Sequence, residues 1–379
     1  MAALYAGGYR FLVIFLVDFI FSPAFSSDFA RYFFWCGLIA SVVGLPVAAR
    51  SQVQKNPLSH FQQLIMAILL LIPTVIVSWF FWQDSAQSFG LIFFAGILLV
   101  GFEIMRMERA ALGQFGLLTL CSIASLFALL ALTQVQTESA ELVIILTFAG
   151  LAIPVFFSYF AVSYSVPATL TLTEAFKPVS ANAATSLIAT GLTFIVPLLL
   201  IEEFGREYSS TLAQVFAIAS LSFSYPRYLA AGFIYAAKHN QATLTTVKQL
   251  TRKIAIFVVL SCALFIVCAW WFAPMVLQLL LLFVAMQFSQ LTLPYANWWT
   301  SQGQEVRVMR LNFLSGTILA IASSAVFYFQ ATGPERGQSI LILFTLYQLL
   351  RFYLYSKPSQ PPTTATVLSH RKPSSHQEN

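Results

Sequence analysis

The chain has 379 residues, of which 59% are hydrophobic and only 9% are charged, and its net charge is +6. An average soluble domain carries roughly 25% charged residues, so this composition excludes a water-soluble globular protein. No loop combines basic and aromatic residues in a dense cluster, which excludes a nucleic-acid-binding surface.

Twelve apolar runs follow one another along the chain. Each is close to the roughly 20 residues that a helix needs to cross a bilayer. Because the runs are continuous and backbone in hydrocarbon must satisfy its own hydrogen bonds, we predict helices. The predicted fold class is an all-α integral membrane protein with twelve transmembrane helices in two six-helix bundles. The predicted spans cover residues 3–25, 30–49, 63–82, 87–105, 115–133, 140–163, 181–201, 209–236, 253–272, 275–298, 309–330 and 338–356.

The positions of Lys and Arg predict how these spans are oriented. When the spans are threaded alternately, sixteen of the twenty basic residues fall in loops or helix ends on one side of the membrane. Arg31, Arg206 and Arg336 fall on the other side, and Arg227 lies inside a span. Since cytoplasmic loops are enriched in Lys and Arg, both chain termini are predicted to be cytoplasmic.

A weak internal repeat indicates a duplicated architecture. Ile39-Ala-Ser and the following Pro46 recur as Ile218-Ala-Ser and Pro226, at offsets of 179 and 180 residues. An even number of spans in each half makes the two halves parallel, and such halves enclose a central cavity. We therefore predict an N-terminal bundle over residues 1–165, a C-terminal bundle over 166–356, and a disordered cytoplasmic tail rich in Pro, Ser and Thr over 357–379.

Arg227 is the deepest cation in the predicted spans. It lies about 16 Å along its helix from Lys238, too far to reach the headgroups easily. Charges at this depth are costly and mark function by default. Tyr225 and Tyr228 beside it can supply hydrogen bonds. Two interpretations stay open, an internal ion pair and a cavity cation that receives an anionic substrate.

Two carboxylates also fall within predicted spans. Asp18 lies about 12 Å deeper along the first span than Arg10, near the middle of the membrane. It is predicted either to carry a coupling H+ or Na+ or to pair with Arg227. Glu103 lies three residues before Arg106, so an i,i+3 ion pair explains it at least as well as a functional role does.

The tenth span carries a polar stripe. Gln287, Gln290, Pro294 and Asn297 recur every three or four positions, so they share one helix face. Lipid does not tolerate such a face. It is therefore predicted to line a cavity or to form hydrogen bonds with a neighbouring helix.

The sequence contains no pattern for chemistry on a substrate. The predicted spans hold no histidine and no pair of carboxylates, and the chain lacks both GxxxxGK[ST] and GxSxG. We therefore expect no catalytic residue, no metal site and no cofactor apart from a coupling ion. Transport of a substrate is favoured over an enzymatic reaction.

Two segments resemble a known family. Phe25-Ser-Ser-Asp-Phe-Ala-Arg-Tyr32, predicted to join the first two spans, resembles the Gly-Pro-Glu-Glu-Phe-Gly-x-Tyr turn of Wzx-type polysaccharide flippases in the MOP (MATE-related) superfamily. Arg307, Arg310 and Asn312, which follow Gly303, resemble that family's junction between helices ten and eleven. The chain departs from the family at Ser22, where relatives often carry Arg.

This resemblance implies a flippase with two lobes around a cavity that opens alternately to the two sides. The implied cargo is an oligosaccharide repeat unit on undecaprenyl pyrophosphate, moved from the cytoplasmic to the periplasmic leaflet of a bacterial inner membrane for O-antigen, capsule or exopolysaccharide assembly. The implied partners are this glycan, membrane lipids, a polysaccharide polymerase and a chain-length regulator, but no nucleic acid. A buried cation suits pyrophosphate, and amide groups suit sugar hydroxyls. The candidate substrate-binding residues are Arg227, Tyr225, Tyr228, Gln287, Gln290, Asn297 and Arg10.

Three other classes are weighed against the flippase. A MATE-like drug or cation exporter shares the fold, but its cavity is expected to be rich in carboxylates. A polysaccharide polymerase is expected to have a large periplasmic loop, and a membrane acyltransferase an intramembrane histidine. The sequence shows neither feature.

Overall fold

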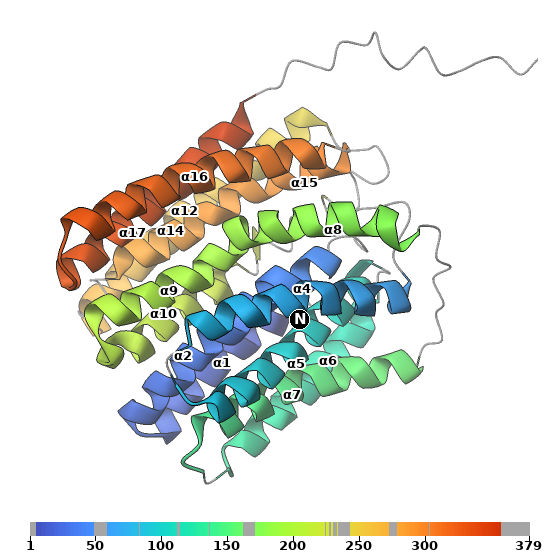
Figure 1. Cartoon of the computed structure of the whole chain (residues 1–379), viewed down its shortest axis with the longest axis vertical. Coiled ribbons are helices and arrows are strands. Elements are labelled where there is room, and N and C mark those ends of the chain that lie inside the picture. The colour runs from blue at the N-terminus through green and yellow to red at the C-terminus, as the bar shows by residue number, and fades with distance from the viewer. Residues whose placement is uncertain are drawn as a thin grey trace, which may run out of the picture.

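The computed structural model describes residues 5–48, 59–82, 84–111, 114–135, 137–161, 171–223, 225–226, 229, 233, 243–272, 279–302 and 304–357. Within these ranges the chain is helical and contains no β-strand, and its helices form twelve segments that run alongside one another (Figure 1). The predicted fold class is therefore confirmed.

The helices of the N-terminal half begin with α1 (Tyr5–Ile20). The next segment is α2 (Pro23–Ile39), which the π-helix η1 (Ala40–Gly44) continues. They are followed by α4 (His60–Phe80), α5 (Ala86–Ala111), α6 (Phe115–Leu132) and α7 (Ala140–Ala161). Helices α5, α6 and α7 pack against one another, and α2 packs on α5 and α7.

The C-terminal half begins with a segment built from α8 (Leu172–Ser186), the π-helix η2 (Leu187–Gly191) and α9 (Leu192–Phe204). The 3₁₀-helix η3 (Arg206–Tyr208) then leads into α10 (Ser209–Ser222), which is followed by α12 (Leu244–Phe272). One further segment consists of α14 (Leu280–Ser289), the 3₁₀-helix η4 (Gln290–Thr292) and α15 (Leu293–Ser301). The last two are α16 (Glu305–Phe329) and α17 (Pro334–Ser356).

Eight helices of the described chain are long and apolar enough to cross a membrane by themselves. The helices α1, α6 and α10 are shorter, and the segment that contains α14 and α15 is interrupted by η4. Large apolar side chains stay exposed along α4, α12 and α16, among them Ile72, Leu260 and Ile321. Exposed apolar surface on this scale suits hydrocarbon and not water, so the chain is a multi-pass membrane protein.

The turn between the first two segments differs from the prediction. Residues 25–32 were predicted to join two spans, but they lie inside α2, which begins at Pro23. Ser22 caps this helix by accepting a hydrogen bond from the Phe25 amide at 3.3 Å, and proline suits the first helical position because it has no amide hydrogen to satisfy. The segment that carries the family resemblance is therefore the start of a helix and not a loop.

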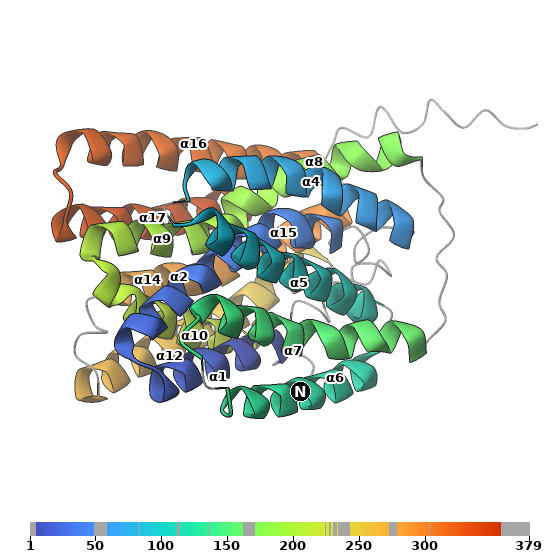
Figure 2. The same cartoon turned by 60° about the horizontal axis from the view of Figure 1, so that its bottom comes forward.

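The two halves contact each other through the same few helices. Helices α1 and α2 of the first half pack against α9 and α10 of the second, and α4 and η1 pack against α8. Figure 2 shows α2 between its own bundle and the helices α9 and α10. We call the end of the molecule with Tyr5 and Ser356 the inner end, and the end with the α1–α2 turn the outer end. The inner end is the one predicted to be cytoplasmic.

Candidate functional site

Gly37 of α2 lies at a close contact between the two halves. A Cβ atom added there would lie 2.1, 2.4 and 2.8 Å from three atoms of the Phe194 ring in α9. Real Cβ atoms essentially never make contacts below 3.0 Å, so a side chain at position 37 would collide with the Phe194 ring where it now lies. The Phe194 ring also packs on Phe216 of α10, with ring centroids 5.0 Å apart, and Phe216 meets Phe34 of α2 edge to face at 5.4 Å.

Polar contacts hold the same two halves together at the outer end. The Asp18 carboxylate in α1 accepts a hydrogen bond from the Ser210 hydroxyl at 2.6 Å and another from the Gln214 amide, both in α10. The Ser27 hydroxyl of α2 donates to the carbonyl of Arg206 in η3. These contacts form what we call the outer seal together with the aromatic cluster around Gly37, which lies about 21 Å further along α2 from the outer end.

The position of Asp18 corrects one prediction. Asp18 is two residues from Ile20, where α1 ends, so its carboxylate lies at the outer end and not near the middle of the membrane. The predicted first span ran to residue 25 because Phe21 and the residues after Pro23 continue the apolar pattern. The Ser22–Pro23 cap ends that span earlier.

Arg10 is buried in an ion pair. Its Nη2 lies 2.9 Å from Glu103 Oε1 of α5, while the other carboxylate oxygen of Glu103 lies 2.6 Å from Arg106 Nη2. The predicted i,i+3 pair is therefore present, and Arg10 is added to it from another helix. In this state the guanidinium of Arg10 is bound to a protein carboxylate, which leaves its predicted contact with substrate as a proposal for another conformation.

Arg227 and Tyr228 lie outside the described residues. Tyr225 is described; it is 43% exposed, and its ring packs on Phe257 of α12 with centroids 4.8 Å apart. Gln287 of α14 is fully buried, and its amide nitrogen donates to the Ser222 hydroxyl at the end of α10. Gln287 therefore contacts the helix that precedes Arg227.

The rest of the predicted polar stripe is interrupted. Residues 290–292 form η4, a 3₁₀-helix that winds more tightly than an α-helix and shifts the residues after it around the axis. Gln290 is buried and its amide nitrogen donates to the adjacent Ser289 hydroxyl at 2.9 Å, and Asn297 in α15 is partly buried. The stripe was predicted either to line a cavity or to form hydrogen bonds with a neighbouring helix. Gln287 forms such an interhelical hydrogen bond, with Ser222.

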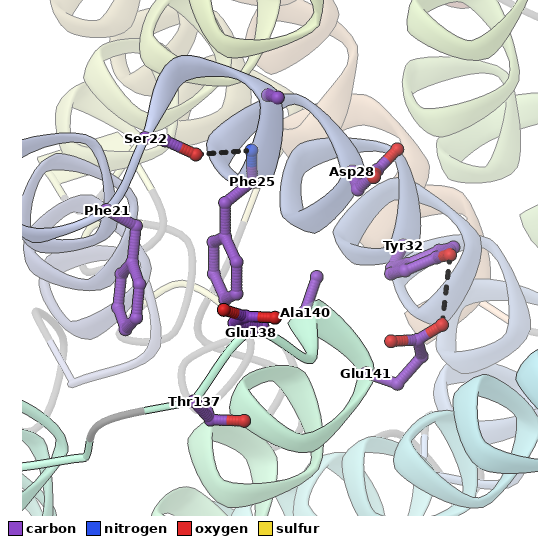
Figure 3. Close-up of a pocket in the computed structure, with 10 residues that line it drawn as sticks. Phe21, Ser22, Phe25, Asp28, Tyr32, Thr137, Glu138, Ala140 and Glu141 are labelled. Carbon is purple, nitrogen blue, oxygen red and sulfur yellow. Dashed lines mark hydrogen bonds between the residues drawn. The ribbon is translucent and has the colours of Figure 1, made fainter.

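A pocket of about 450 Å³ opens at the outer end of the N-terminal half (Figure 3). Three carboxylates contribute to its lining, Asp28 from α2, Glu138 from the loop before α7, and Glu141 from the first turn of α7. The rings of Phe21 and Phe25 stack beside them with centroids 4.2 Å apart. No basic side chain lines the pocket, so its electrostatic field favours a cation.

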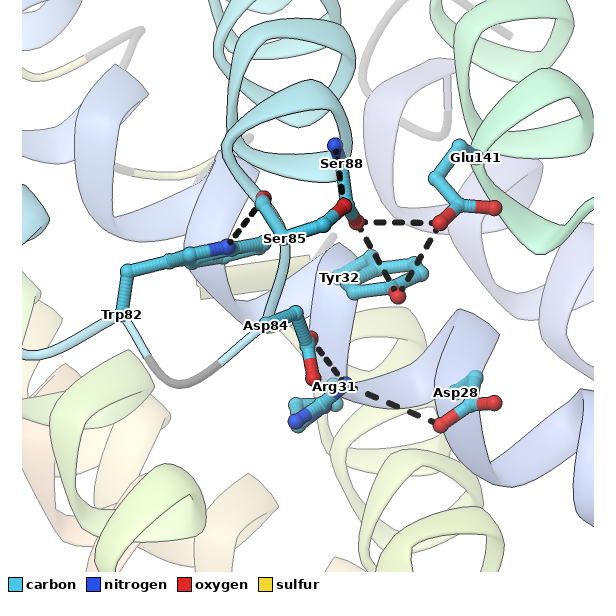
Figure 4. Close-up of polar contacts among 8 residues, drawn as sticks. All are labelled: Asp28, Arg31, Tyr32, Trp82, Asp84, Ser85, Ser88 and Glu141. Atoms are coloured by element: carbon cyan, nitrogen blue, oxygen red, sulfur yellow. Dashed lines mark hydrogen bonds and ion pairs between the residues drawn. The ribbon is translucent and has the colours of Figure 1, made fainter.

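A polar network orients the wall of this pocket (Figure 4). Glu141 Oε1 accepts hydrogen bonds from the Ser88 hydroxyl at 2.9 Å and the Tyr32 hydroxyl at 3.2 Å. Next to it, Arg31 pairs with Asp84 from the loop before α5, and Asp28 Oδ1 lies 3.8 Å from Arg31 Nη2. The network fixes the start of α2 against α5 and α7.

Sequence reasoning missed two features of these contacts. Gly37 gave no signal because a glycine within an apolar run predicts only a helix of lower propensity. Arg351 was assigned to the inner helix end, but its side chain is buried between α16 and α17 and is 4% exposed. Gln348, one turn before Arg351, and Asn312 within the apolar run of α16 were the available signal that these two helices have a polar contact.

Comparison with solved structures places this fold among transporters. The chain superposes on an inward-facing multidrug resistance MATE family transporter of the MOP superfamily with a TM-score of 0.54 and 10% identity, covering 94% of each chain. An outward-facing transporter of the same description gives a TM-score of 0.57 at 11% identity, over 94% of this chain and 92% of the other. A eukaryotic MATE transporter gives a TM-score of 0.60 at 13% identity, and the superposition covers 93% of this chain and 91% of the transporter. No protein-family model and no curated protein matches the sequence. At these identities the comparison establishes a shared fold.

Proposed function

We propose that the protein is a flippase that moves an oligosaccharide repeat unit linked to undecaprenyl pyrophosphate across a bacterial inner membrane, for assembly of a surface polysaccharide. The inner end of the helices faces the cytoplasm, where the predicted basic loops lie, and the substrate is released at the outer end. The two bundles rock against each other, so that a path between them opens to one side at a time.

The observation that carries this proposal is the outer seal. Its contacts join the two halves of a fold that solved MATE transporters adopt in both inward-facing and outward-facing forms. Gly37 against Phe194 and Asp18 against α10 are contacts between bundles and not within one. They can be broken without unfolding either bundle, which is what alternating access requires.

Asp18 provides the coupling to an ion gradient. As a carboxylate, Asp18 accepts two hydrogen bonds from α10. A proton or Na+ arriving from the outer side competes with Ser210 and Gln214 for the same oxygens. Occupation of Asp18 by such an ion therefore weakens the outer seal and favours the outward-open state.

The test is the fate of the lipid-linked repeat units. Deleting the gene is expected to leave the repeat units on the cytoplasmic face and to remove the surface polysaccharide. Surface glycan capped with single repeat units would instead identify a polymerase and contradict the proposal.

One observation favours a second candidate, a MATE-like exporter of organic cations. The outer pocket combines Asp28, Glu138 and Glu141 with two stacked phenylalanine rings, and aromatic faces and carboxylates together attract organic cations. An exporter of this kind would give cation resistance to cells and leave their surface polysaccharide unchanged. The two candidates thus predict opposite phenotypes for the same deletion.

A further inference from the structure

Arg351 in α17 is a buried cation without a carboxylate partner among the described residues. Its Nε donates to Asn312 Oδ1 of α16 at 3.1 Å, and its Nη1 donates to Gln348 Oε1 at 3.0 Å. The guanidinium carbon lies 5.6 Å from the centre of the Tyr347 ring. All of these partners are neutral, so the positive charge is oriented but not compensated by them.

Other buried arginines in the structure provide a comparison. Arg10 and Arg31 are buried, the Arg336 side chain is 12% exposed, and these three arginines pair with the carboxylates of Glu103, Asp84 and Glu203 respectively. Arg109 is also buried, and it donates to the Gln114 side chain and the Ser158 carbonyl. A buried charge is strongly unfavourable unless an opposite charge accompanies it. Within the described part of the chain, a carboxylate supplies that opposite charge at Arg10, Arg31 and Arg336 and not at Arg351.

A second group beside Arg351 is also unsatisfied. Gln348 is fully buried, its oxygen accepts from Arg351, and its amide nitrogen has no hydrogen-bond partner among the described residues. Both unsatisfied features, the positive charge and the N–H donors, are complementary to a ligand that carries negative charge and several acceptor oxygens. A phosphate group has these properties.

The depth of Arg351 in the membrane fits such a ligand. Arg351 lies five residues before Ser356, the end of α17, which places it about 7.5 Å inside the inner end. Arg307, whose guanidinium stacks 3.8 Å from the centre of the Trp299 ring, lies closer to that end and donates to the Lys357 carbonyl at 3.0 Å. Arg307 therefore lies between the inner end of the helices and Arg351.

The same cluster contacts the segment that reaches the other bundle. The Tyr347 hydroxyl donates to the carbonyl of Ile188 at 2.6 Å. Ile188 belongs to η2, the π-helix that joins α8 to α9, and α8 and α9 pack against the N-terminal half. A ligand that reorients Arg351 and Tyr347 therefore acts on the helix that forms part of the contact between the bundles.

We propose that Arg351, with the amide of Gln348, binds the pyrophosphate of the lipid-linked substrate as it enters the C-terminal bundle from the inner leaflet. This assignment rests on the proposed flippase function. It adds a binding residue independent of Arg227, in a different helix. In the state described here the site is closed, and Asn312 and Gln348 hold the guanidinium until the headgroup replaces them.

The test measures binding of inorganic pyrophosphate to the purified full-length protein in nanodiscs of phosphatidylcholine. Arg351→Gln removes the charge and keeps hydrogen-bonding groups, Arg351→Lys keeps the charge, and Gln348→Leu removes the unsatisfied amide. Arg310→Gln is the matched control, since Arg310 is exposed near the same end of α16. We expect wild-type, Arg310→Gln and Arg351→Lys proteins to be stabilised thermally and saturably by pyrophosphate, and Arg351→Gln to bind at least tenfold more weakly. Gln348→Leu is expected to bind several-fold more weakly and, because Arg351 loses one acceptor, to melt somewhat lower without ligand.

Wild-type affinity in Arg351→Gln would overturn the assignment. If that variant does not fold, wild-type affinity in Gln348→Leu overturns it equally. Nanodiscs that contain phosphatidylglycerol distinguish a pyrophosphate site from a site for ordinary lipid headgroups. If this lipid competes equally with pyrophosphate for the site, the assignment to pyrophosphate is contradicted. If pyrophosphate binding depends on Arg351 but the protein moves no lipid-linked glycan, the flippase function is refuted. The assignment of an anion-binding site at Arg351 is then still supported.

Discussion

Gly37→Ala tests the outer seal by adding one methyl group between the bundles. The new Cβ would lie 2.1 Å from the nearest Phe194 ring atom, so either that ring turns and loses its packing on Phe216 or α2 and α9 move apart. Overpacking of this kind costs about 1–3 kcal/mol. Because the clash is between bundles, separating them relieves it while each bundle stays folded. The equilibrium between sealed and open outer ends is therefore expected to shift toward open by about 5–150-fold.

Spin labels at Ala24 of α2 and Glu207 of η3 measure this shift. Both residues are exposed at the outer end and belong to different halves. The four native cysteines, Cys36, Cys121, Cys262 and Cys268, are replaced first. Pulsed electron resonance on Gly37→Ala is expected to show a larger population at long distances than the parent protein. Combining Gly37→Ala with Phe194→Leu, which removes the ring, should return part of the population to short distances.

Gly90→Ala is the matched control for this experiment. Gly90 is also a helical glycine, but a Cβ added there has no atom within 4 Å. It should leave the distance distribution unchanged. An unchanged distribution in Gly37→Ala as well would refute the reasoning about the seal.

The remaining predictions concern charged residues. Asp18→Asn keeps one acceptor oxygen but turns an N–H toward a donor on α10, so it should weaken the outer seal by about 0.5–1.5 kcal/mol and reduce gradient-driven transport. If transport by this variant still follows the gradient, Asp18 is only a structural contact. Glu103→Gln leaves Arg10 buried without its carboxylate and should lower stability by about 3–5 kcal/mol in thermal melts, whereas Asp28→Asn, at a more exposed pair, should cost about 1 kcal/mol or less. Arg227→Ala should abolish transport with near-normal membrane insertion and Arg227→Lys should retain part of it, while wild-type transport by a well-expressed Arg227→Ala protein would refute a role in substrate binding.

The composition and the order of apolar runs were enough to predict the fold class. A run of about 20 apolar residues has one stable arrangement in hydrocarbon, so each run predicts a spanning helix without knowledge of its neighbours. The i,i+3 pair of Glu103 and Arg106 was predictable for the same reason, since both residues lie on one helix.

Contacts between helices were not predictable in this way. That Arg10 joins Glu103, that Asp18 faces Ser210, and that Gly37 faces Phe194 all depend on how α1 and α2 are packed against α5, α9 and α10. The depth of Asp18 was wrong because an apolar pattern continued through a helix end that the Ser22–Pro23 cap determines. Arg227 and Tyr228, which would test the predicted role, lie outside the described part of the chain.

The most direct test of the proposed function uses the purified protein in vesicles with a fluorescent, undecaprenyl-pyrophosphate-linked oligosaccharide in the inner-facing leaflet. An impermeant quencher outside the vesicles reports how much of the glycan has crossed. The proposed function predicts movement of the glycan that requires the wild-type protein and is faster with an imposed proton or sodium gradient. Glycan that stays in its original leaflet, while the same vesicles transport an organic cation, would contradict it.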